Sequence, residues 1–140
     1  MMIKTFKKIA VMGVLALAAC TSQVQKTVND ITGKWDILSA KGVCTKDGEE
    51  QAFIQFDANG EMNGNTSVNS FFGSYTLEDG KLKLENIGMT RRMGANMEIE
   101  MAITEALNGI AGIVVEDSVA TLTNESGEEI MTMKKSTVQE

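Results

Sequence analysis

Residues 71–87, FFGSYTLEDGKLKLENI, constrain the fold of this chain more than any other stretch. Apolar and polar residues alternate on both sides of Asp79-Gly80, most clearly where Leu82 and Leu84 alternate with lysines. A period of two places every second side chain on one face of a half-buried strand. An Asp-Gly pair between two such runs favours a tight hairpin turn. The stretch therefore predicts a strand, a turn and an antiparallel strand.

Short runs of the same kind occur before and after this hairpin. In the earliest, KWDILSA, we expect Trp35, Ile37 and Ser39 on one face and Asp36 and Leu38 on the other. The next run, QAFIQFD, is closed by the turn DANG before EMNGN. The later runs are GIVVE (112–116), SVATLT (118–123) and EIMTMKK (129–135).

The period changes between residues 96 and 108, where apolar residues recur at helical intervals. Asn96 is a plausible cap for this helix and Gly109 a plausible stop. The residues expected on its buried face are Ile103 and Leu107, and those expected in water are Glu98 and Glu105. About eight short strands and one amphipathic helix predict a mainly β fold, a small antiparallel barrel-like meander, because closure removes exposed strand edges.

The first twenty residues have the layout of a bacterial secretory signal. Lys4, Lys7 and Lys8 precede an uncharged apolar run over residues 9–19, which is too short to span a membrane. The run ends in Leu-Ala-Ala-Cys, which resembles the lipobox of bacterial lipoproteins, with Cys20 as the lipidated residue. The alternative is an ordinary cleaved signal with an incidental cysteine.

These features predict a division of the chain into four parts. Residues 1–19 form the signal peptide, 20–30 the lipidated cysteine and a polar tether, 31–135 one β domain, and 136–140 a C-terminal tail. Lipobox resemblance implies a diacylglyceryl group and usually an N-acyl chain such as palmitate, so the anchor should be firm. Thr21 stands where an inner-membrane retention signal would place Asp, which favours the outer membrane, on its periplasmic face or at the cell surface.

The charge of the chain argues against nucleic acid as a partner. There are 13 Lys+Arg against 19 Asp+Glu, and removing the signal peptide takes away three lysines and no acid. Binding to a phosphate backbone depends mainly on Lys and Arg. We therefore expect no nucleic-acid partner.

Sulfur-containing side chains raise two questions. Met89, Met93, Met97 and Met101 follow one another at a spacing of four, either as a ladder of soft-metal ligands or as packing. The chain has no histidine to complete a metal site, so packing is favoured and no metal is expected. Cys44 has no intramolecular partner if Cys20 is lipidated, and a half-buried hydrophobic role is favoured over a reactive thiol.

No residue set predicts catalysis. DANGE resembles the start of a calcium loop, but Gly60 stands at its fourth position and Val68 at its twelfth, so a hairpin turn is favoured. The acid pairs 49–50, 116–117 and 128–129 could supply two glycosidase carboxylates, yet all lie at predicted turns. The absence of histidine removes the usual general base. We expect no enzyme activity, no catalytic residues and no cofactor.

Three stretches follow the order and spacing of one family's motifs: TGKWDILSAKG, GNTSVNSFFGSYT and MTRRMGANMEIEMAITEAL. Through them, residues 32–134 resemble the META domain of HslJ-like bacterial lipoproteins. The chain departs from the family at its two usual cysteines, which are replaced by Val68 and Ala95. The resemblance implies a barrel-like β fold with one helix and an association with envelope stress, and it implies no chemistry.

The sequence therefore predicts a lipid-anchored, non-catalytic protein of the cell envelope. Its partners would be the membrane, through the lipid, and an unknown envelope protein that it binds or supports. An alternative is a carrier of a small hydrophobic ligand inside the barrel, because about eight strands can just enclose one. Bulky candidates for the interior, such as Trp35, Phe56 and Phe71, favour a filled barrel.

Overall fold

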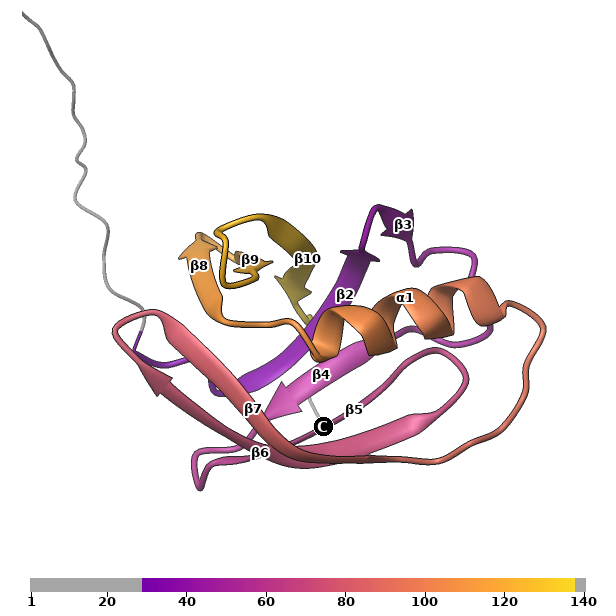
Figure 1. Ribbon diagram of the computed structural model, residues 1–140, viewed down its shortest axis with the longest axis horizontal. Coiled ribbons are helices and arrows are strands. Elements are labelled where there is room, and N and C mark those ends of the chain that lie inside the picture. Colours follow the sequence, from indigo (N-terminus) through magenta and orange to yellow (C-terminus); the bar gives the residue numbers. More distant parts are fainter. Residues whose placement is uncertain (1–28, 138–140) are drawn as a thin grey trace, which may run out of the picture.

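In a computed structural model, which describes residues 29–137, the chain folds into a closed antiparallel β-barrel with one helix (Figure 1). Eight strands close the barrel in the order β2-β4-β5-β6-β7-β8-β9-β10, with β10 pairing back to β2. A two-residue strand, β3, is added to the free side of β2. The predicted mainly β, barrel-like meander with one helix is confirmed.

Most elements lie where the sequence predicts them. The strands are β2 Gly33–Ala40, β3 Val43–Cys44, β4 Phe53–Phe56, β5 Glu61–Asn65, β6 Ser70–Glu78, β7 Lys81–Met89, β8 Gly112–Glu116, β9 Val119–Thr123 and β10 Glu129–Lys135. The helix α1 spans Met97–Leu107, between β7 and β8.

The hairpin of β6 and β7 turns at Asp79 and Gly80, as predicted. Both residues have positive φ, 52° and 79°, which is the signature of a type I′ turn. The turn DANG likewise joins β4 to β5, where the Gly60 N–H donates to the Asp57 carbonyl at 3.1 Å. A hairpin is therefore the correct interpretation of the stretch that resembled a calcium loop.

The barrel interior is filled by side chains. Ile37, Ile54 and Met133 have no exposed area, and Phe56 and Phe71 are 1% exposed. These residues belong to one continuous core cluster. Filling by bulky side chains is the usual state of a small eight-stranded barrel.

One predicted face is wrong at the end of β2. Trp35 and Ile37 point inward as expected, but the fully buried residue after them is Ala40, while Ser39 is only half-buried. Leu38 causes the change, because it is an extra residue in β2 with no partner between Thr132 and Met133 of β10. Such a bulge reverses the alternation of the strand beyond it.

The helix buries the face that its period predicts. Ile103 and Leu107 are buried and Glu98 and Glu105 are exposed. Asn96 occupies the N-cap position of α1, as predicted, but its side chain makes no capping hydrogen bond. Within residues 29–137 no helix is long and apolar enough to cross a membrane.

Candidate binding groove

The barrel is weakest between β7 and β8. Only one residue pair, Lys81 with Gly112, is in register between these strands. Two further backbone hydrogen bonds close the seam, from Leu82 N–H to the Ala111 carbonyl at 3.1 Å and from Ile113 N–H to the Gly80 carbonyl at 2.9 Å. Beyond Leu82, β7 runs on to Met89 with register partners only in β6. One edge of β7 is therefore open in the described part of the chain.

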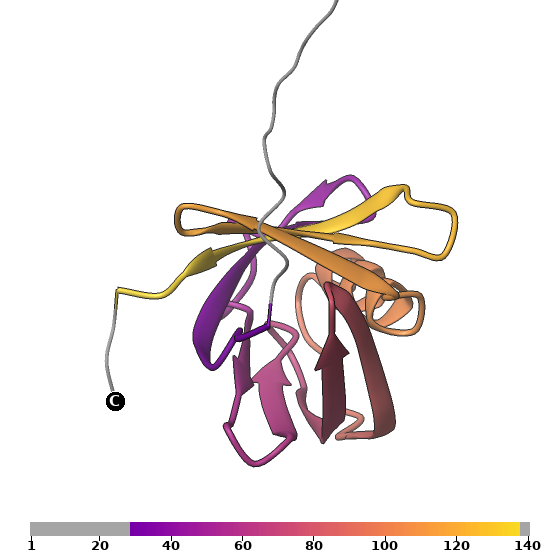
Figure 2. The ribbon, with the colours of Figure 1, turned by 90° about the vertical axis from the view of Figure 1, so that its left-hand side faces the viewer.

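The helix lies at this opening. Figures 1 and 2 show α1 beside the opening, below the strands β8–β10 and above β7. Between β7 and α1 is a groove of about 470 Å³ that is open to solvent on one side. It is lined from β7 by Ile87, Gly88 and Met89, from the connecting segment by residues 90–93, and from α1 by Met97, Glu100, Thr104, Leu107 and Asn108, with Asn69 at one end.

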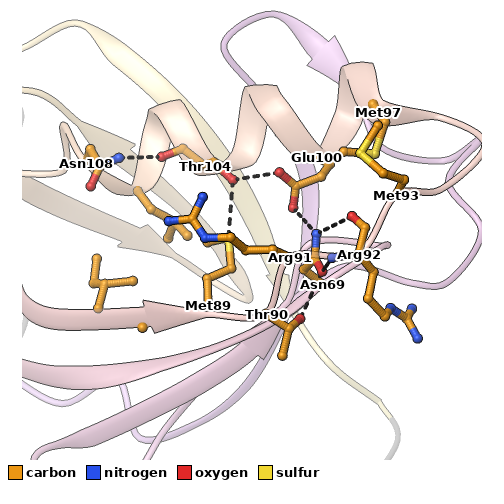
Figure 3. Close-up of a pocket in the computed structure, with 13 residues that line it drawn as sticks. Asn69, Met89, Thr90, Arg91, Arg92, Met93, Met97, Glu100, Thr104 and Asn108 are labelled. Atoms are coloured by element: carbon orange, nitrogen blue, oxygen red, sulfur yellow. Dashed lines mark hydrogen bonds between the residues drawn. The ribbon is translucent and has the colours of Figure 1, made fainter.

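A buried carboxylate lies in the wall of the groove (Figure 3). Glu100 is 8% exposed, and one of its oxygens accepts hydrogen bonds from Thr66 Oγ1 at 2.8 Å and Asn69 Nδ2 at 3.0 Å. Its other oxygen accepts from Thr104 Oγ1 at 3.2 Å. Within residues 29–137 Glu100 forms no salt bridge, so neutral donors alone stabilise it. Buried charges need such donors because loss of water is costly.

Asn69 links this carboxylate to the segment after β7. Its Oδ1 accepts from the Arg92 N–H at 2.6 Å and from Thr90 Oγ1 at 2.9 Å. Its Nδ2 also donates to the Arg92 carbonyl at 3.1 Å. Asn69 is 3% exposed, so these hydrogen bonds are buried and hold residues 90–92 at the end of the groove.

The two adjacent arginines differ in their partners. The Arg92 guanidinium donates to the Val68 carbonyl from Nε at 3.2 Å and from Nη2 at 2.6 Å. Arg91 forms no hydrogen bond or ion pair with any residue in 29–137. Figure 3 shows its side chain extended along the groove below Thr104. Arg91 is thus an unmatched positive charge at the groove.

The methionines only partly fit the predicted packing role. Met93 is 84% exposed and Met101 is 65% exposed, so the packing prediction is wrong for both. In α1 the inward side chains are those of Ile99 and Ile103. Met97 and Met89 are half-buried and line the groove. Met89 is also the last residue of β7.

The remaining candidates lie apart from the groove. Cys44 is exposed, which corrects its predicted half-buried role, because β3 lies on the outside of β2. The three acid pairs are exposed. No group of three or more His, Cys, Asp or Glu residues within 29–137 could hold a metal ion. Sequence reasoning missed Glu100 and Asn69, whose partners come from distant segments.

Comparison with known proteins gives the family. The family model of the META domain matches residues 26–137. This chain belongs to the META domain family. None of the curated proteins matches it.

Solved structures share the fold of this META domain at low identity. A protein from Burkholderia xenovorans, solved by NMR, is 22% identical with a TM-score of 0.61, over 86% of this chain and 100% of that one. A DUF4847 family protein from Bacteroides vulgatus ATCC 8482 is 16% identical with a TM-score of 0.53, over 77% and 95%. At these identities the likeness concerns the fold alone.

The cysteine positions of the family can now be placed. The segments that carry Val68 and Ala95 do meet, at Gly94, the residue before Ala95. A Cβ atom added to Gly94 would lie 2.8 Å from Val68 Cγ2. In this META domain, packing and the hydrogen bonds of Asn69 join the two segments.

Proposed function

We propose that this META domain protein is a lipid-anchored, non-catalytic module of the cell envelope that binds or supports another envelope protein through the groove between β7 and α1. The observation that carries the proposal is the open edge of β7 beside a groove of about 470 Å³. Ligand sites are typically concave and largely apolar, with a few placed polar groups.

The position in the envelope is supported by the first twenty residues of the sequence. Cys20 and its signal lie outside the described residues, so this part of the proposal rests on the lipobox layout alone. With two or more acyl chains the protein would stay attached to the outer membrane, and the polar tether would present the domain beyond the lipid. The resemblance to HslJ-like lipoproteins links this placement to envelope stress.

A binding role agrees with the chemistry of the groove. Glu100 is already hydrogen-bonded by three side chains, and the chain has no histidine to act as a base. Exposed methionines suit a binding surface, because their flexible, polarizable side chains adapt to different partners. Met93 lines the groove and Met101 lies beside it on α1, and they are the two most exposed large apolar side chains in the described chain.

The alternative function, a carrier with its ligand inside the barrel, has less support. Phe56, Phe71 and Met133 occupy that interior with at most 1% exposure. A ligand there would have to displace core side chains, whereas the groove lies outside the core.

The proposal is tested by photo-crosslinking in the intact envelope. A photoreactive amino acid is placed at Met101 beside the groove, or as a matched control at Val119, which is 42% exposed on β9. We expect a discrete protein adduct from position 101 and none from position 119. Equal yields from both positions, or adducts only with lipid, would remove the groove as the binding surface.

A further inference from the structure

We propose that the groove takes an extended peptide segment of the partner, which adds as a strand to the open edge of β7. This inference deepens the proposed function and rests on it. The segment would have alternating apolar side chains and a carboxylate group that pairs with Arg91. Main-chain hydrogen bonds and one ion pair would then hold it.

The backbone of β7 provides the first argument. Lys83, Leu84, Glu85, Gly88 and Met89 have register partners only in β6, and Asn86 and Ile87, at an irregularity of the strand, have none. The pairing with β8 ends at Lys81. An open strand edge presents unpaired N–H and C=O groups, which is a template for pairing with another chain. Addition of a peptide strand to such an edge is a common mode of recognition.

The helix α1 forms the second wall of a groove along the open edge of β7. The groove is bounded by Met89 and Ile87 on the strand side and by Leu107 and Met97 on the helix side. In an added strand, every second side chain would face this wall and the others would face solvent. These four side chains are apolar and two of them are methionines, so this part of the wall would accept apolar side chains.

The charges in the groove determine the sign of the ligand. Glu100 is satisfied by Thr66, Asn69 and Thr104, and it is buried. Arg91 has no partner within residues 29–137 and extends along the groove (Figure 3). The unmatched charge is therefore positive. A guanidinium binds a carboxylate through two parallel hydrogen bonds, which gives both affinity and orientation.

A selection experiment tests the inference on the full-length lipoprotein in detergent micelles. A random-peptide phage library is selected against the wild-type protein, and the enriched peptides are synthesised. We expect alternating apolar residues with one acidic residue or a free C-terminal carboxylate. N-methylation should weaken binding when it falls on one set of alternate residues and not on the other, because only one set of N–H groups faces β7.

Matched charge variants test the role of Arg91. Arg91→Gln should weaken binding of the selected peptide at least about tenfold, the size expected for loss of a charge-assisted hydrogen bond. Lys134→Gln removes the same charge from an exposed side chain on β10 and should leave the affinity unchanged.

Two results would overturn the inference. One is failure to enrich any peptide, and the other is a selected peptide whose binding is equally insensitive to N-methylation at both sets of positions. If crosslinking from Met101 still gave a protein adduct, the groove would then bind a folded surface and only the added strand would be wrong. If crosslinking also failed, the proposed function itself would be wrong.

Discussion

Replacing Asn69 with alanine is expected to lower the free energy of unfolding by about 2–4 kcal/mol, because buried groups that lose their hydrogen-bond partner cost about 1–3 kcal/mol each. The change removes a donor from the buried carboxylate of Glu100, at 3.0 Å, and the acceptor of the Arg92 N–H, at 2.6 Å. It also removes the acceptor of Thr90 Oγ1, at 2.9 Å, and so one more contact with the segment after β7. Urea unfolding followed by tryptophan fluorescence measures the loss, because Trp35 is the single tryptophan and is buried.

Asn63 provides the matched control for this substitution. It lies exposed on β5, and its side chain forms no hydrogen bond within residues 29–137. Asn63→Ala should therefore change stability by less than about 0.5 kcal/mol, as surface substitutions usually do. Similar losses for both alanine variants would mean that the hydrogen bonds of Asn69 do not stabilise the fold.

Replacing Cys20 with alanine is expected to abolish acylation and to release the protein from the membrane. The thiol of Cys20 is the group that the lipobox layout predicts to be lipidated. Without acyl chains nothing in the polar tether would hold the protein, since stable attachment needs two signals. Metabolic labelling with a clickable fatty acid and fractionation of membranes measure the two effects.

Cys44→Ala serves as the control, because it removes the other cysteine of the chain. Cys44 is exposed at the end of β3, and its loss should change neither labelling nor fractionation. Undiminished labelling of the Cys20→Ala protein would contradict the lipoprotein assignment.

Local pattern was enough to predict the strands and the helix. The turn at Asp79 and Gly80 needs positive φ at both residues, and an Asp-Gly pair is typical of such a turn. The buried face of α1 follows from the helical period, which placed Ile103 and Leu107 correctly. These features depend on neighbours in the sequence, so a single chain reveals them.

The groove depends on distant neighbours and could not be predicted in this way. Glu98 and Glu100 are the same residue type two positions apart, yet Glu98 is exposed and Glu100 is buried. The two point to different sides of α1, and the donors that stabilise the buried one, Thr66 and Asn69, lie 34 and 31 residues earlier in the chain. Likewise, no local sequence pattern predicts that β7 and β8 pair at one position only.

The open edge of β7 is tested most directly by amide hydrogen exchange. The full-length protein is measured twice, purified in detergent and again in isolated envelopes, where the proposed partner would be present. In the purified protein, we expect part of the amides over residues 83–89 to exchange rapidly, while those of β9, which pairs with strands on both sides, stay protected. In envelopes, exchange over residues 83–89 should slow and β9 should be unchanged. Uniform protection of β7 in the purified protein, or equal exchange in both samples, would contradict an open edge that binds a partner.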